Sequence, residues 1–185
     1  MNLLEQISED EMIATFLSAE LGSSRFAEKL SGLLGGRALV TLDAAERRAL
    51  LDEHRSYGRR EGLFLGFPPE VDWFRAEVDR EEVLDVLFID WDWWLTISDG
   101  TRRPRDAVRR IRAGEVPGSN VEEHEPYARQ PQPPLIAVTT PAHAPIVLLE
   151  GHVRLTAYAL FPHLVPDELE ILLGVSDEMP NWALF

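Results

Sequence analysis

The chain of 185 residues contains no cysteine, and this absence removes several kinds of chemistry at once. It excludes disulfide bonds, a thiol nucleophile and a thiolate metal site. Lys29 is the only lysine among the 18 basic residues, and no GxxxxGK[ST] phosphate-binding loop surrounds it. The GxSxG motif of serine hydrolases and the histidine spacing of helical metal sites are absent as well.

Long hydrophobic runs are also lacking. No run reaches the roughly 18 residues of a membrane span, and the N-terminus MNLLEQISEDEM does not have the basic and apolar segments of a secretory signal. The hydrophobic content of 45% is that of a globular protein, and the length suits one well-buried domain, alone or with a helical extension. We therefore expect a cytoplasmic protein that does not contact membranes.

Positive charge is scarce, since the net charge is −14 at pH 7. Because nucleic-acid binding depends on basic side chains that neutralise phosphates, this charge argues against a nucleic-acid partner. The segment TRRPRDAVRRIR at 101–112 nevertheless holds six arginines and one aspartate, a local charge of +5. A site for a small anion fits this distribution better than a groove for a nucleic acid.

Residues 1–66 are expected to form a helical region that packs on a core formed by 67–185. The pairs Ser8–Glu11 and Asp43–Glu46 have the spacing of capping boxes, and apolar residues follow each pair at helical intervals. Glycines lie close to the end of each of the three expected helices. These helices form either a structural layer or a docking surface for a protein partner or a second copy of the chain.

The next part of the chain predicts short helices and an aromatic cluster. One helix starts at Pro69, a second runs from about Asp79 into the aromatic stretch, and a third runs from Pro104 to just before Gly114. Four of the five tryptophans lie in this part of the chain. Such a density indicates either a hydrophobic core or a surface on which a ring of the ligand stacks.

The last part of the chain predicts a sheet, and with the helices it predicts an α+β fold. Segment 115–134 contains five prolines and is expected to be a loop or lid. The runs LIAVTT (135–140), PIVLL (145–149) and ELEILLGVS (168–176) are expected to form strands, and 153–161 a helix.

The segment PIVLLEGHVRLTAYALFP at 145–162 has the order strand, glycine turn, helix. The start of a helix carries unpaired N–H groups and a partial positive charge, and so it binds anions. Gly151 allows the backbone to approach a ligand. Arg154 is opposed by the helix dipole unless an anion, onto which its guanidinium can fork, is bound there. The alternative partner for Arg154 is an acidic side chain.

Two further side chains of this turn are candidate catalytic groups. Glu150 either complements the helix N-terminus or acts as a general base or Mg²⁺ ligand beside a bound phosphate. His152 either donates a hydrogen bond to a phosphate, takes part in proton transfer, or caps the turn. Thr156 is a further candidate for ligand binding.

Residues 135–160 resemble the core of the ParB/sulfiredoxin-like superfamily. Domains of that superfamily carry a strand, a Gly-x-x-Arg turn and a helix, and here Gly151, His152, Arg154 and Ala157 match. The resemblance implies a small mixed sheet with flanking helices, in which the turn cradles nucleotide phosphates.

The residues that depart from this pattern reduce the number of superfamily activities that the chain can have. Sulfiredoxin-type chemistry uses a cysteine at the position of His152, so reduction of sulfinic acids is excluded. The ParB partition proteins have an arginine where Val153 stands and a DNA-binding helix-turn-helix, for which the chain after Leu160 leaves no room. Free-serine kinases of the superfamily use a glutamate near the nucleotide, which keeps Glu150 as a candidate.

Thr101, Arg102 and Arg103 are candidates for a second half of the site, because they follow a Ser-Asp-Gly turn at the start of the basic helix. If the two turns converge, Arg102 or Arg103 clamps an anionic ligand together with Arg154. The alternative is a solvated turn and helix face.

Two functions remain open. The first is a nucleotide-dependent phosphotransferase or nucleotide hydrolase, which binds a nucleoside triphosphate, with or without Mg²⁺, through the glycine turn. The second is a non-catalytic ParB-like binding or regulatory module that acts through a protein partner or DNA.

Overall fold

The centre of the fold is a five-stranded sheet, seen in a computed structural model that describes residues 1–129 and 132–185. In spatial order the strands are β1 (Asn2–Ile7), β2 (Asp72–Asp79), β5 (Glu168–Val175), β3 (Leu135–Thr139) and β4 (Val147–Glu150). β5 and β3 are parallel, whereas the other neighbours are antiparallel. The sheet is therefore mixed, and the predicted α+β class is confirmed.

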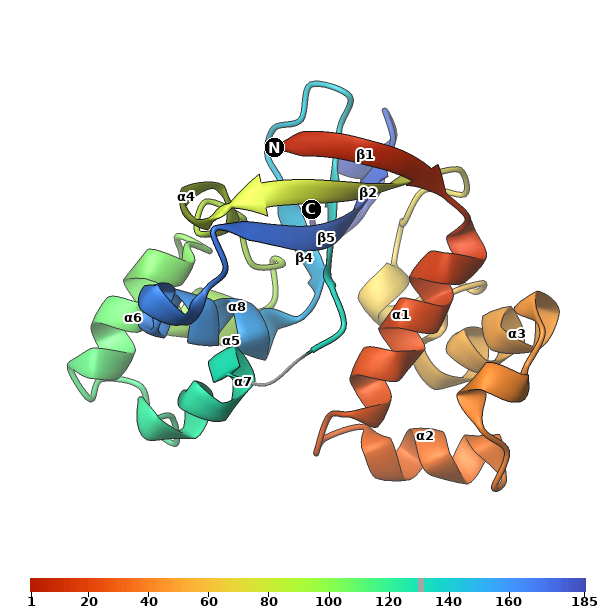
Figure 1. The fold of residues 1–185 in the computed structure, drawn as a ribbon, viewed down its shortest axis with the longest axis horizontal. Helices are drawn as coiled ribbons and strands as arrows, with labels where there is room; N and C mark the ends of the chain where they lie inside the picture. Colours follow the sequence, from red (N-terminus) through yellow and green to blue (C-terminus); the bar gives the residue numbers. More distant parts are fainter. Residues whose placement is uncertain (130–131) are drawn as a thin grey trace.

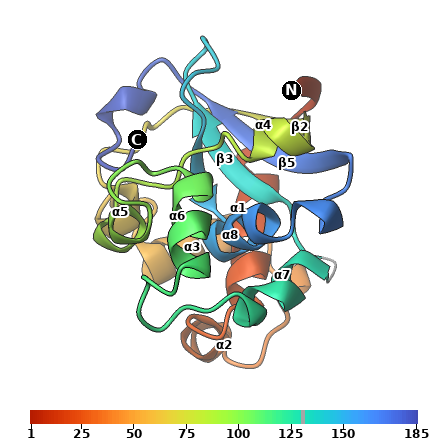
Figure 2. The same cartoon turned by 90° about the vertical axis from the view of Figure 1, so that its left-hand side faces the viewer.

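The longer helices form two groups beneath the sheet in the view of Figure 1. The group at the right contains α1 (Glu9–Leu21), α2 (Ala27–Leu34) and α3 (Ala44–Arg55). The group at the left contains α5 (Asp92–Ile97), α6 (Pro104–Arg112), α7 (Glu125–Arg129) and α8 (His152–Leu160). A single turn, α4 (Arg80–Val83), follows β2, so the prediction of a helix from about Asp79 into the aromatic stretch is wrong beyond this turn. Figure 2 shows α6 and α7 beside α8, and both contact it.

The N-terminal region contains the three expected helices but also a strand that the sequence did not predict. Ser8 caps α1, because its Oγ accepts a hydrogen bond from the Glu11 amide, although the Glu11 side chain pairs with Arg75 instead of closing the box. The capping box at Asp43–Glu46 is complete. β1 lies at the edge of the sheet with most of its residues exposed, so it lacks the alternating pattern that identifies a half-buried strand.

The prediction of a helix from Pro69 is wrong, because residues 72–79 form β2. The strand pattern was hidden by Arg75, which follows half-buried Phe74 and precedes buried Ala76. Its guanidinium is neutralised by Glu5 on β1, Glu11 on α1 and Glu170 on β5. Acids that are distant in the sequence therefore allow a charge inside this strand.

The three predicted strands of the C-terminal part and the helix from Pro104 are confirmed as β3, β4, β5 and α6. The predicted loop at 115–134 contains the short helix Glu122–His124 and α7, and its positions 130–131 lie outside the described residues. The division of the chain at residue 66 stays a prediction. No helix in the described part of the chain has the length and apolar character of a membrane span.

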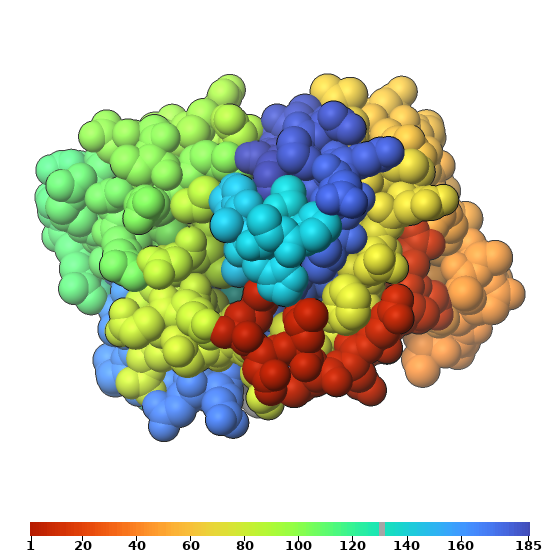
Figure 3. All heavy atoms as spheres, turned by 90° about the horizontal axis from the view of Figure 1, so that it is seen from above, coloured from red at the N-terminus to blue at the C-terminus, as the bar shows by residue number. Residues whose placement is uncertain are grey.

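The C-terminal residues 182–185 connect the two halves of the molecule. On one side, Trp182 Nε1 donates to the carbonyl of Leu63 (2.7 Å). On the other side, the Asp90 amide donates to the carbonyl of Leu184 (3.0 Å). In the view from above in Figure 3, this blue segment lies between the N-terminal part of the chain, in orange and yellow, and the green helices.

Candidate functional site

The site begins at Gly151, which connects β4 to α8 and has a φ of +104°. A Cβ at this position would lie 2.4 Å from Leu135 Cδ2 and 3.0 Å from Arg154 Nη2. Both the backbone conformation and the packing therefore require glycine. No side chain caps the start of α8, so its first N–H groups and the positive end of its dipole face the turn.

Arg154 lies in the first turn of α8 and is only 5% exposed. Its guanidinium donates to the carbonyl of Pro133 and lies 3.4 Å from Glu150 Oε1. Glu150 is therefore the acidic partner that was expected for Arg154 as the alternative to a bound anion. Because a guanidinium carries five N–H donors, these two contacts leave donors for a ligand.

Glu150 ends β4 and keeps 20% of its side chain exposed. Burial raises the pKa of its carboxyl, and the nearby positive charge of Arg154 opposes that shift. A raised pKa brings a carboxyl closer to the range in which it can both take up and release a proton near neutral pH.

His152 packs its ring against two aromatic rings, those of Trp94 and Phe88. The ring lies 4.8 Å from that of Trp94 and 6.1 Å from that of Phe88, both nearly parallel to it. Burial, together with the charge of Arg154, lowers the pKa of His152 to about 3, so the imidazole is neutral at pH 7. Its Nε2 atom is buried without a hydrogen-bond partner among the described residues. His152 can therefore donate or accept a hydrogen bond, but it does not carry a charge.

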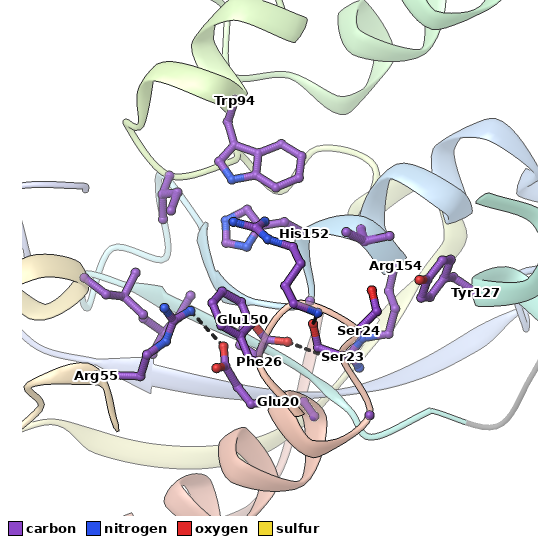
Figure 4. Close-up of a pocket in the computed structure, with 18 of the residues that line it drawn as sticks. Glu20, Ser23, Ser24, Phe26, Arg55, Trp94, Tyr127, Glu150, His152 and Arg154 are labelled. Atoms are coloured by element: carbon purple, nitrogen blue, oxygen red, sulfur yellow. Dashed lines mark hydrogen bonds and ion pairs between the residues drawn. The ribbon is translucent and has the colours of Figure 1, made fainter. Parts of the chain in front are cut away.

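These residues line a partly open cavity of about 290 Å³, and Figure 4 shows how its side chains are arranged. One wall is the turn 149–154, and the facing wall is the segment 19–26 at the end of α1. Arg55 of α3, the aromatic segment 89–94 and Tyr127 of α7 complete it. The cavity therefore lies where the N-terminal helices meet the β4–α8 turn.

Glu20 is a second carboxylate of this cavity that the sequence analysis missed. It is 1% exposed, and its two oxygens lie 2.7 Å from His54 Nε2 and 2.8 Å from Arg55 Nη2. Burial raises the pKa of Glu20, and burial also lowers that of His54 to about 4. The sequence contains a sign of this role: Glu20 falls three residues after Leu17, so it is a charged residue on the apolar face of α1.

Two further arginines of the cavity were also missed. The guanidinium of Arg55 lies 4.0 Å from the ring centroid of Phe26, and that of Arg25 lies 5.0 Å from it. Arg25 is exposed and forms no ion pair with any residue described in the structure. With Arg154, three guanidiniums face two carboxylates, so the cavity carries an excess of one positive charge when both acids are ionised.

The other predicted ligand-binding residues do not line the cavity. Thr156 is buried and its hydroxyl donates to the carbonyl of His152 within α8. Thr101 donates to Asp106 Oδ2 (2.7 Å) at the start of α6. Arg103 is exposed at the same helix end, away from the turn.

Arg102 has a different set of partners from the one expected. Its guanidinium donates to three main-chain carbonyls, those of Phe88 (2.7 Å), Leu184 (3.1 Å) and Phe185 (2.6 Å). Burial lowers the pKa of Arg102 from its ordinary value. The turn that contains Arg102 therefore holds the C-terminal segment. Within the described residues, it does not converge with Arg154.

A metal site is not evident from the protein side chains, since residues 1–129 and 132–185 contain no group of three or more His, Asp or Glu placed to hold a metal ion. No protein-family model matches the chain, and no curated protein or solved structure matches it either. The geometry and chemistry of the cavity are therefore the basis for a proposed function.

Proposed function

We propose that the protein binds a small phosphate-bearing molecule in the cavity between segment 19–26 and the turn 149–154. The observation that carries this proposal is that three guanidiniums line the same cavity as the uncapped start of α8. Arg154 has free donors, and Arg25 has no acidic partner among the described residues. Arginine and an open helix N-terminus are the two features that proteins use most often to hold phosphate. The resemblance of the turn to that of the ParB/sulfiredoxin-like superfamily supports the same ligand.

The proposal includes catalysis by Glu150. A buried carboxyl with a raised pKa, next to a proposed phosphate site, suits a general base that activates a hydroxyl or water. With a nucleoside triphosphate and Mg²⁺, this arrangement supports phosphoryl transfer or nucleotide hydrolysis, because Mg²⁺ is commonly held by one or two carboxylates and by the phosphates themselves. The non-catalytic binding module remains the alternative.

The experiment is a calorimetric titration of pyrophosphate, ATP, CTP and GTP, with and without Mg²⁺. Arg25→Ala is the informative variant, because Arg25 is exposed and its removal leaves no buried group unpaired. We expect its loss to weaken binding about tenfold, the value of one charge-assisted contact. Arg103→Ala, which removes an exposed arginine away from the cavity, is the matched control and should bind as the wild type does.

Glu150→Gln separates the two functions. Binding that persists in this variant while turnover disappears supports catalysis, whereas binding without turnover in the wild type supports the non-catalytic module. If the wild type binds neither pyrophosphate nor any nucleotide at millimolar concentration, the proposed function is wrong.

A further inference from the structure

Two tryptophans at the cavity are unusually exposed. Trp91 and Trp93 line it, yet Trp91 is 50% and Trp93 is 44% exposed to solvent. Large aromatic side chains normally bury most of their surface, and exposed aromatic surface at the mouth of a cavity is characteristic of a contact with a ligand or partner. The neighbouring Trp94 is buried, so the exposure is specific to these two positions.

The backbone that carries the two tryptophans is firmly held. Just before them, the amide of Leu87 donates to the carbonyl of Ile146 (2.9 Å) and the amide of Leu148 donates to that of Leu87 (2.8 Å), which places this segment along the free edge of β4. Just after them, Trp94 stacks on His152. The exposed rings therefore stand on a fixed support, and their exposure is a property of the fold.

An aromatic ring also stands on another wall of the cavity. Phe26 is half-buried and carries the guanidiniums of Arg25 and Arg55 over its ring. Arg154 and the start of α8 lie on the wall formed by the turn 149–154 (Figure 4). A molecule that contacts both kinds of surface needs an apolar planar part and an anionic part.

We infer that Trp91 and Trp93 form a stacking surface for a planar aromatic base of the ligand, so that the site selects a nucleoside phosphate over a phosphate that lacks a base. This inference rests on the proposed phosphate site and adds the substrate class to it. The cavity volume of about 290 Å³ is just below the usual range for ligand cavities, which begins at about 300 Å³, so the ligand must be small. Stacking tolerates different bases, because every base presents a π face.

The test compares AMP with ribose 5-phosphate, which carries the same phosphate and sugar but no base. Both are titrated calorimetrically into the wild type, Trp91→Ala, Trp93→Ala and the double variant. We expect the wild type to bind AMP about 10- to 100-fold more tightly than ribose 5-phosphate, the range that stacking of a base on aromatic side chains supplies. The double variant should lose this preference while its affinity for ribose 5-phosphate stays the same.

Trp91→Phe and Trp93→Phe provide the conservative controls, since a phenyl ring still stacks, and most of the preference for AMP should return. Val40→Ala, at a position 87% exposed and away from the cavity, controls for loss of an exposed apolar side chain. The inference is overturned if the wild type binds both probes equally, or if the preference for AMP survives in the double variant. Absence of binding of both probes overturns the inference alone if pyrophosphate still binds, and overturns the proposed phosphate site as well if pyrophosphate and the nucleoside triphosphates also fail to bind, so the two failures are distinguishable.

Discussion

At the scale of single residues, Gly151 determines the shape of the turn, and its replacement gives the first prediction. Gly151→Ala places a Cβ against Leu135 and Arg154 at a φ of +104°, so we expect the free energy of unfolding to fall by about 2 kcal/mol or more. Gly114→Ala is the control, because its φ is +70° but no atom lies within 4 Å of the new Cβ. Equal losses in urea unfolding of the two variants would show that packing at Gly151 is unimportant.

His152 gives a second prediction at this scale, in the pH dependence of stability. Its pKa is about 3 in the folded chain and about 6.5 when unfolded, so between these values only the unfolded chain takes up the proton. The free energy of unfolding therefore falls as the pH drops below 6.5. Because folding lowers the pKa of His152, the protein has its full stability with respect to this group above pH 6.5 and loses stability on acidification.

The variant His152→Phe keeps the ring stack and removes the titration. We expect its stability relative to the wild type to increase by about 2 kcal/mol between pH 7.5 and pH 5. Glu20, Glu150 and His54 titrate in both proteins, so their effects cancel in the difference. A difference that does not change with pH in urea unfolding would mean that His152 titrates normally in the folded chain.

At the scale of elements, Arg102 connects the turn before α6 to the C-terminal segment. Arg102→Lys replaces a planar fork that serves three carbonyls by a group that cannot reach all of them, so we expect a loss of about 1–3 kcal/mol. Hydrogen exchange should become faster in residues 182–185. Arg103→Lys should change neither stability nor exchange, and unchanged exchange of residues 182–185 in Arg102→Lys would show that Arg102 does not hold the C-terminal segment.

The sequence was informative about elements whose pattern is local. The Ser8 cap, the capping box at Asp43–Glu46, the Gly151 turn and the apolar runs of β3 and β4 each carry their own signal over a few residues, and each was predicted correctly. β1 and β2 depend on each other: the strand at 2–7 is exposed, and Arg75 is tolerated only because acids on three other elements surround it. Such pairing is set by tertiary contacts.

The same distinction applies to the site. Glu150, Gly151, His152 and Arg154 follow one another and were found together, whereas Glu20, Arg25 and Arg55 come from the other group of helices. Only the packing of those helices brings them to the turn. The sequence showed that tryptophans cluster at 91–94, but not that Trp94 is buried while Trp91 and Trp93 remain exposed.

At the scale of the whole molecule, the cavity is built from both groups of helices, so a bound ligand should stabilise both. In the presence of saturating pyrophosphate, we expect amide exchange to slow in residues 22–26 and 150–154 together, and the melting temperature to rise with ligand concentration. Arg25→Ala measured at the same pyrophosphate concentration should show a smaller effect in both segments. Protection confined to one segment would show that the ligand does not bridge the two walls.

The C-terminal segment can influence how the ligand specificity of the cavity evolves. Its main-chain and side-chain hydrogen bonds reach Leu63 on one side and Asp90 on the other, and Leu63 and Ile89 both line the cavity. A substitution in 182–185 can therefore alter the separation of the walls while every ligand-contacting residue stays the same. Selection for a different ligand has an indirect route through this segment, and a search for altered specificity should randomise these positions together with the cavity lining.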